Sequence, residues 1–282
     1  MKNEHENQKE ENYLYIGTAL SPIHVGGSGG NIIADMAIQK EPRELLPKID
    51  STAWKGSVYS SMSKDKNQKW DLLFSDLNLL FFPICSSIQP CVLISSPTQI
   101  ERFVKFIKMY SVEEMEEFIQ KYEKNDIRSE LDPKKKVCYF GSRLLQNILV
   151  GDYLYEIDRT NKGIEEVITL LATLIQKPLE QIVIVGHEDF VDLVHDELEY
   201  ITRVKIGENH VSSEESLFVE EYLPEESVLY GFIKKQPHIG LEQQNKIGVE
   251  MKDIPKIIHI GKNTTLGKGI MKLERGVVKN GN

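Results

Sequence analysis

The order of the expected strands and helices predicts an α+β fold with an antiparallel or mixed sheet. Runs of apolar and β-branched residues typical of strands lie towards both ends of the chain, and the clearest amphipathic helices lie between them. Several strands follow one another without a helix, which argues against a doubly wound parallel sheet. Apolar residues make up 40% of the 282 residues, enough for a sizeable core.

The first third of the chain predicts strands around one helix. "YLYIGTAL", residues 13–20, alternates and predicts a strand, after which a glycine-rich loop leads into "NIIADMAI", expected to be extended. Thr52 is a suitable N-cap for a helix over 53–62. "WDLLFSDLNLLFFPI" predicts a strand, a turn and a second strand, and "QPCVLISS" predicts another apolar strand.

The middle of the chain predicts most of the helices. "SPT" at 96–98 opens a helix with apolar residues at helical spacing, and a charged second helix is expected over 112–122. The lysines at 134–136 indicate a loop, and "YEIDRT" indicates a short strand. An apolar helix over 165–175 is ended by Pro178.

The last third predicts strands again. "QIVIVG" has the composition of a buried strand, and "EDFVDLVHDELEYI" predicts an amphipathic helix after it. "TRVKIG" and "LFVEEYL" flank a polar tip and predict a hairpin. "ESVLYGFI" and "KIIHIG" are expected to be further strands.

The ends and the cysteines limit where the protein works. Residues 1–12 are polar and have no apolar run, so a disordered tail and no secretory signal are expected. No apolar run approaches the roughly 20 residues of a membrane span, so no membrane partner is expected. Cys85, Cys91 and Cys138 show no metal-type spacing, which favours a reduced, cytoplasmic protein.

Charge is distributed unevenly along the chain. The formal net charge of −9 argues against a generic nucleic-acid binder. Fourteen acids against Arg203 and Lys205 make residues 180–226 strongly acidic, whereas residues 252–282 carry seven bases against two acids. A basic face is therefore compatible with the acidic total, although both blocks also suit ordinary solvated surface.

Three segments have features suited to phosphate. Gly26, Gly27, Gly29 and Gly30 crowd into five residues but match neither the Walker pattern nor GxGxxG. Such glycines let backbone N–H groups approach an anion, although a bare cluster also suits a surface turn. In "STAWKGS" a lysine lies near a helix start, and "IHIGKNTTLGKGIMKL" interleaves glycines and lysines. Together they favour a nucleic-acid strand over a single nucleotide.

The blocks "LSPIHVGGSGG" with "ADMAIQKE", "DSTAWKG" and "IHIGKNTTLGKGIMKL" are similar to motifs of the RAMP superfamily of CRISPR proteins. The typical forms in that family are "LTPLHVGSG" with "VDLPIQRE", "GSSLKG" and "IQIGGxxTxGxG". "LFVEEYLPEESVLYGFI" extends the similarity, which reaches both ends and the last third of the chain. The combination resembles the repeated backbone subunit of the type III-B (Cmr) effector complex.

The resemblance implies a fold and an assembly. The fold would be a modified ferredoxin-like (RRM-like) palm over residues 13–282, with a helical insertion at about 97–180 and a β-hairpin thumb at about 202–223. Copies of the chain would stack as a filament along a guide (CRISPR) RNA, beside other type III subunits. Complementary target RNA would be cut at regular intervals within this ribonucleoprotein.

The resemblance also implies residue roles. Asp35 matches the aspartate that cuts target RNA with a divalent metal, Mg²⁺ or Mn²⁺, and it would be the metal ligand. His24 matches a histidine that acts as acid or base, or orients the loop. A second catalytic carboxylate is expected from Glu221 or its neighbour Glu220. The expected RNA-binding residues are Gly26, Gly27, Gly29, Lys40, Lys55, Lys262 and Lys268.

This sequence departs from the family pattern near the expected guide contacts. Lys40 stands where the family has arginine, Ala37 where it has proline, and Ser60 near the place of a further arginine. Arginine and lysine contact phosphate differently, so these changes bear on guide binding. They leave a second hypothesis open, a non-catalytic scaffold that coats the guide RNA. A third hypothesis is a small-molecule phosphate enzyme.

Overall fold

The structure, a computed structural model, describes part of the chain in ten segments. These are residues 12–27, 29–62, 69–70, 72–125, 136–141, 145–160, 162–206, 212–235, 246–247 and 250–277. The expected tail at 1–12 lies outside the described residues except for Asn12, which begins the first strand.

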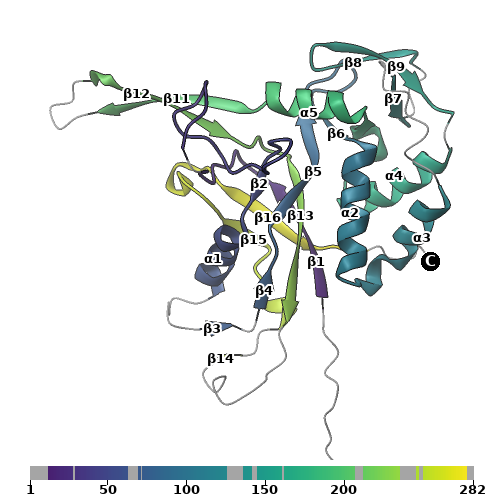
Figure 1. Ribbon diagram of the computed structural model, residues 1–282, viewed down its shortest axis with the longest axis horizontal. Helices are drawn as coiled ribbons and strands as arrows, with labels where there is room; N and C mark the ends of the chain where they lie inside the picture. Colours follow the sequence, from purple (N-terminus) through teal and green to yellow (C-terminus); the bar gives the residue numbers. More distant parts are fainter. Residues whose placement is uncertain are drawn as a thin grey trace, which may run out of the picture.

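A twelve-stranded mixed sheet forms the centre of the molecule (Figure 1). The strands run in the order β15-β16-β1-β13-β5-β6-β10-β7-β9-β8, with β2 paired to β5 and β4 to β13. Their bounds are β1 Asn12–Ala19, β2 Lys48–Ile49, β4 Leu72–Phe74, β5 Leu77–Ile84, β6 Val92–Ser95, β7 Lys136–Tyr139, β8 Asn147–Val150, β9 Tyr153–Asp158, β10 Ile182–Ile184, β13 Val228–Lys235, β15 Ile257–His259 and β16 Ile270–Arg275. β1 is antiparallel to both β13 and β16, whereas β10 is parallel to β6 and β7 is parallel to β9. The predicted α+β class with a mixed sheet is confirmed.

The sheet buries both of its faces, because successive side chains of a strand point to opposite sides. On β1, Leu14 and Ile16 join one hydrophobic core, while Tyr15 and Ala19 join the other. Figure 1 shows α2, α3 and α4 beside one face and α1 beside the other. The helices are α1 Ser51–Met62, α2 Pro97–Met109, α3 Glu116–Lys124, α4 Lys162–Leu174 and α5 His187–Asp196, with short 3₁₀ turns η1 Glu113–Met115, η2 Leu179–Gln181, η4 Met251–Asp253 and η5 Thr264–Leu266.

The start of α2 is as predicted, and that of α1 is not. The Ser96 side chain accepts a hydrogen bond from the Gln99 amide, and a proline occupies the first turn of α2. α1 begins two residues before the predicted helix, so Thr52 is a helical residue and not the cap. Its first amide, Ser51 N–H, instead donates to the Asp76 carboxylate at 2.8 Å. A carboxylate from a distant turn therefore already occupies this helix N-terminus.

Other differences arise where strands pair over long distances. The expected helical insertion at 97–180 also contains β7, β8 and β9, which pair into the sheet through β10. β7, β8 and β16 were missed, because none has strong alternation of its own and all three are recruited by neighbouring strands. Lys136, expected to lie in a loop, is the first residue of β7. "NIIADMAI" forms isolated bridges at Met36 and Ile38 and not a strand.

The expected hairpin projects from the body of the molecule (Figure 1). β11 (Glu199–Ile206) pairs antiparallel with β12 (Ser212–Tyr222), so the hairpin prediction is confirmed and starts three residues earlier than predicted. α5 ends at Asp196, since the residues after Leu198 extend into β11. A separate two-stranded sheet joins β3 (Lys69–Trp70) and β14 (Lys246–Ile247). Among the described residues, no helix is both long and apolar enough to span a bilayer.

Candidate nucleic-acid interface

The glycine-rich segment and the residues after it, from Gly26 to Ile38, form a tight arch on the molecular surface. Gly26 pairs with Ile38 across the arch, and Gly27 N–H donates to the Ala37 carbonyl at 2.9 Å. A β-carbon on Gly27 would lie 2.9 Å from the Ile38 carbonyl oxygen, and Gly29 has a φ of +95°. These glycines are required by the arch itself, and they leave its exposed backbone open to a ligand.

Asp35 lies on this arch at the base of the β11–β12 hairpin. Its side chain is exposed, and Oδ2 accepts a hydrogen bond from Val219 N–H of β12 at 2.8 Å. The next residue, Met36, continues the pairing, because its amide donates to the Val219 carbonyl and its carbonyl accepts from Glu221 N–H. Lys262 approaches from the C-terminal loop, with Nζ 3.3 Å from Met36 Sδ. The Asp35 carboxylate is thus oriented by β12 while one oxygen faces outward.

Glu221 anchors the arch from below. Its carboxylate is fully buried and pairs with Lys40 Nζ at 2.7 Å. It also accepts hydrogen bonds from Ile38 N–H at 2.9 Å, Asn31 Nδ2 at 3.2 Å and Tyr200 Oη at 3.2 Å. Burial and the neighbouring Glu221 charge raise the pKa of Tyr200 to about 12, so its hydroxyl stays protonated and can donate. Both Glu221 and Lys40 are therefore engaged within the protein.

Glu220 points the other way from β12 and ties the C-terminal loop to the hairpin. Its carboxylate forms an ion pair with Arg203 at 2.7 Å and accepts from Tyr222 Oη at 2.6 Å. Asn263 donates to both Glu220, at 3.0 Å, and Tyr222, at 2.7 Å. Burial, with Glu220 as the next cause, raises the pKa of Tyr222. Neither adjacent glutamate has a free carboxylate at the surface.

His24 is buried beneath the arch. Its Nδ1 lies 2.7 Å from the Glu221 carbonyl oxygen, and because a carbonyl only accepts, Nδ1 carries the proton. Nε2 has no hydrogen-bond partner in the described part of the chain and lies under Gly26. The His24 carbonyl accepts from Lys262 N–H, and Gly261 fits there only because it lacks a β-carbon. These contacts suit the orienting role better than direct acid–base catalysis, which stays a prediction.

Of the four lysines expected to bind RNA, one is ion-paired within the protein and three have no ion pair among the described residues. Lys40 is held by Glu221, whereas Lys262 and Lys55 are exposed and have no carboxylate partner among the described residues. Lys55 Nζ lies 5.4 Å from the Tyr59 ring on α1, and Lys268 Nζ lies 5.5 Å from the Tyr222 ring. Lys262 therefore lies beside the arch and Lys268 beside β12, and no described contact joins Lys55 to the arch.

Several residues of this site were not predicted from the sequence. Asn31, Tyr200, Arg203 and Asn263 hold the two glutamates, yet they are ordinary polar residues in their local sequence. All four lie in segments with a predicted structure, but nothing in the local sequence indicates that they hold a glutamate. Among the described residues, no group of three or more histidine, cysteine, aspartate or glutamate side chains is arranged to hold a metal ion.

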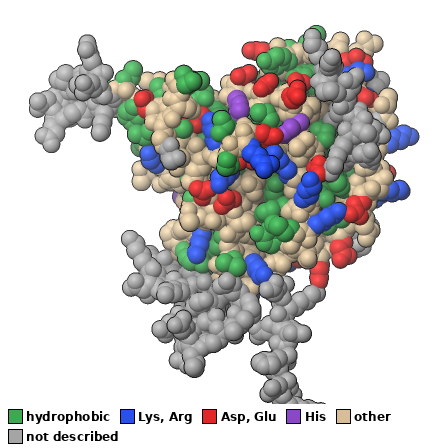
Figure 2. Space-filling model, in the orientation of Figure 1, with side chains coloured by type: hydrophobic (Ala, Val, Ile, Leu, Met, Phe, Trp, Pro, Cys, Tyr) green, Lys and Arg blue, Asp and Glu red, His purple; other side chains and the backbone are tan. Residues whose placement is uncertain are grey.

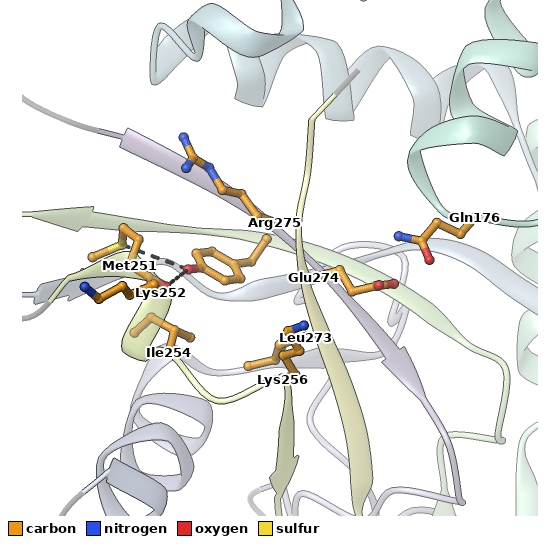
Figure 3. A pocket seen from close by; sticks show the side chains of 9 residues that line it. Gln176, Met251, Lys252, Ile254, Lys256, Leu273, Glu274 and Arg275 are labelled. Atoms are coloured by element: carbon orange, nitrogen blue, oxygen red, sulfur yellow. Dashed lines mark hydrogen bonds between the residues drawn. The ribbon is translucent and has the colours of Figure 1, made fainter. Parts of the chain in front are cut away.

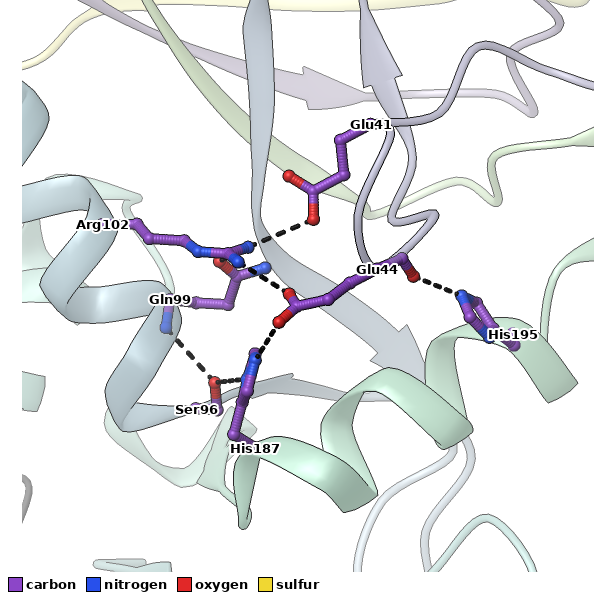
Figure 4. A network of polar contacts seen from close by, with 7 residues as sticks. All are labelled: Glu41, Glu44, Ser96, Gln99, Arg102, His187 and His195. Atoms are coloured by element: carbon purple, nitrogen blue, oxygen red, sulfur yellow. Dashed lines mark hydrogen bonds and ion pairs between the residues drawn. The ribbon is translucent and has the colours of Figure 1, made fainter.

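A second polar network fixes the segment that follows the arch (Figure 4). Glu44 contacts Arg102 at 2.7 Å and His187 Nε2 at 3.0 Å, and His187 Nδ1 lies 3.0 Å from Ser96 Oγ. Figure 2 shows histidine, basic and acidic side chains gathered on this face of the molecule. The order serine, histidine, carboxylate is that of a hydrolase triad. Ser96 is fully buried and caps α2, however, so the network fastens the segment to α2 and α5.

This network predicts a pH dependence of stability. Burial alone raises the pKa of Glu44, but His187 and Arg102 outweigh it and hold the pKa below its usual 4.5. The unfolded chain therefore binds this proton more readily, and the stabilisation is lost as the pH falls below about 4.5. Denaturant unfolding between pH 3 and pH 7 measures this. The free energy of unfolding should fall less steeply with decreasing pH for Glu44→Gln than for the unchanged protein. Equal slopes of the free energy of unfolding against pH in the two proteins would contradict the contact. Glu180→Gln, at an exposed position, is the control.

A mixed sheet carrying an arch, a projecting hairpin and a glycine-lysine C-terminal loop defines a RAMP protein. The chain belongs to the RAMP superfamily, whose family model matches residues 17–272.

Particular relatives are similar over nearly the whole chain. The CRISPR system Cmr endoribonuclease Cmr4 of Pyrococcus furiosus is 24% identical, over 95% of this chain and 97% of that protein. The crystal structure of oligomeric Cmr4 from Pyrococcus furiosus superimposes with a TM-score of 0.69 at 21% identity, covering 95% of this chain and 100% of that one. A chain of the type III-B Cmr-beta complex bound to cognate target RNA superimposes with a TM-score of 0.70 at 14% identity. The match covers 94% of this chain and 97% of that one.

Proposed function

We propose that this chain is the guide-RNA-binding backbone subunit of a type III-B CRISPR effector and cuts complementary target RNA through Asp35. The observation that carries the proposal is the exposed Asp35 carboxylate, oriented by Val219 N–H at the base of the hairpin. The similarity to a Cmr endoribonuclease and to a chain of a complex bound to target RNA supports it. Cleavage of target RNA by complexes carrying Asp35→Ala tests it.

A divalent metal, Mg²⁺ or Mn²⁺, is part of the proposal. Mg²⁺ needs only one or two carboxylates when water and phosphate complete its coordination shell. The donor set of Asp35 fits this, because one oxygen is fixed by β12 and the other is free among the described residues. When bound, the metal would stabilise charge that develops on the reacting phosphate. Asp35 would hold it, and the arch would place the RNA backbone beside it.

A specific observation also favours the scaffold alternative. The two adjacent glutamates of β12, Glu220 and Glu221, are buried and engaged, so Asp35 is the one exposed acid among the described residues of the arch. A scaffold that only coats the guide would bind RNA equally well with Asp35 replaced. The two functions differ in cleavage and its metal dependence, not in binding.

The proposal assigns partners and a compartment. The chain would contact guide RNA, target RNA, further copies of itself and other type III subunits. The compartment would be the cytoplasm. Cys85, Cys91 and Cys138 are all free thiols, as expected of a protein in a reducing compartment.

The exposed lysines predict a salt-dependent contribution to RNA binding. Replacing Lys55 and Lys262 with methionine should weaken binding of single-stranded RNA and lower the slope of log K against log salt. The slope should fall by about 1.4, since each neutralised phosphate on a single strand contributes about 0.7. Filter binding at 50 to 300 mM salt measures it. The matched control replaces Lys105 and Lys121, on α2 and α3, and should leave the slope unchanged.

A further inference from the structure

The hairpin β8–β9 presents an apolar patch to the outside. Leu149 and Leu154 are cross-strand partners and are 40% and 62% exposed, and Tyr153 at the turn is 48% exposed. Ile148 and Tyr155, on the inner face of the same hairpin, are buried in the core. Neighbouring exposed apolar side chains of this kind mark surfaces for interaction with another macromolecule.

Acidic side chains lie on this hairpin and on the helix that packs against its inner side. Asp152 and Glu156 belong to the hairpin itself, and Glu188 and Asp192 lie on the adjacent α5; all four are exposed. Figure 2 shows green apolar and red acidic side chains mixed along this upper edge of the molecule. Because carboxylates repel phosphate, the patch suits a protein partner with a basic surface and not RNA.

The other end of the same sheet offers the complementary surface. A pocket of about 380 Å³ lies along β16, next to η4, and has an apolar floor that includes Tyr15, Ile254 and Leu273 (Figure 3). Its rim carries the three cations Lys252, Lys256 and Arg275 and one carboxylate, Glu274. The pocket is thus apolar at its base, and three of the four charged side chains around its mouth are basic.

Two of the three cations on this rim already have a carboxylate partner within the described part of the protein, and one does not. Lys252 pairs with Glu250, and Arg275 pairs with Glu114 and lies over the Tyr13 ring. Lys256 is exposed and has no carboxylate partner among the described residues. On the hairpin side, Glu156 has only a long contact of 3.9 Å with Lys136. Lys256 and Glu156 are therefore the charges best placed to pair with a neighbour.

We propose that the β8–β9 hairpin of one copy docks into the β16 pocket of the next copy, with Leu154 entering the pocket and Glu156 facing Lys256. The two surfaces differ from each other and lie at opposite ends of the sheet order, β15-β16 against β9-β8. A contact between unlike surfaces of identical chains is head-to-tail, and it extends as an open filament when successive copies do not close into a ring. The inference rests on the proposed function, which requires copies to contact one another along the guide.

Charge reversal tests the contact in the full chain with guide RNA. Glu156→Lys and Lys256→Glu should each weaken association by about ten- to a hundredfold, because each places like charges together. The two variants mixed in equal amounts should assemble again, since every contact in an alternating chain then joins opposite charges. The double variant in one chain should also assemble. Sedimentation velocity and native mass measurement give the copy number, and Lys105→Glu on α2 is the matched control.

Each other outcome overturns the docking. If both single variants assemble like the unchanged protein, the contact does not exist. If the mixture fails to recover, the two residues do not face each other, and loss of another subunit from the complex would identify that subunit as the occupant. If Lys256→Glu lowers RNA binding by single copies, the pocket binds RNA instead. Failure of the proposed function is distinct, because it would appear as no guide-directed RNA cleavage by the unchanged protein.

Discussion

Replacing Asp35 with alanine should abolish target-RNA cleavage by the assembled complex while leaving its RNA binding intact. Removing a single group that stabilises developing charge typically lowers a rate by about 10²–10³-fold, and a metal ligand without a neighbouring substitute should be at the upper end. Neither Glu220 nor Glu221 can substitute, because both are buried and engaged. The measurement is single-turnover cleavage of a guide-complementary RNA, with binding followed in parallel.

Alanine also removes the hydrogen bond to Val219 N–H, so a second variant separates geometry from charge. Asp35→Asn keeps an acceptor oxygen for that amide and removes the negative charge. It should cleave as slowly as the alanine variant and melt like the unchanged protein. Asp196→Ala, an exposed position on α5, is the control for a surface acid. Unchanged cleavage at every position with Asp35→Asn would leave the scaffold alternative as the function.

Replacing Glu221 with alanine should destabilise the whole protein. Breaking a buried pair leaves Lys40 without its partner, and such changes cost about 3–5 kcal/mol. Ile38 N–H and Tyr200 Oη also lose their acceptor in this variant. For a chain of this size the melting temperature should fall by roughly 10 °C. Thermal unfolding followed by circular dichroism measures it.

The controls for this change address the catalytic role expected of Glu221. Glu225→Ala, three residues beyond the end of β12 and exposed, should change stability by no more than about 0.5 kcal/mol. Adding Lys40→Met to Glu221→Ala should cost less than the two single changes together, because the two residues share one contact. If Glu221→Ala melts normally but no longer cuts RNA, Glu221 takes part in the chemistry and not in anchoring the arch.

Elements with a strong local pattern were predictable from the sequence. α2 combines Ser96 as a cap, a proline in the first turn and apolar residues at helical spacing, and it starts where predicted. The β11–β12 hairpin is two β-rich runs around a polar tip. Asp35 itself came from the resemblance of a whole motif and not from its neighbours, since a single aspartate after a glycine loop has no distinctive local signal.

Elements recruited by distant partners were not predictable. β16 belongs to the sheet because β1 and β15 pair with it, and the start of α1 is set by Asp76, a residue 25 positions away in sequence. Their local composition is compatible with several structures, and the choice depends on contacts that appear only after the chain has folded.

The sequence by itself determined the class of the fold, the family, the hairpin and the identity of the exposed acid on the arch. Only the tertiary structure decided what the neighbouring acids and lysines do. Glu220 and Glu221 are adjacent and chemically identical, yet alternation along β12 directs them to opposite sides. One side brings Arg203 and Asn263, and the other brings Lys40, which lies 181 residues away in the chain. A pattern of residues cannot record which buried charge meets which partner, because that depends on packing across the whole sheet.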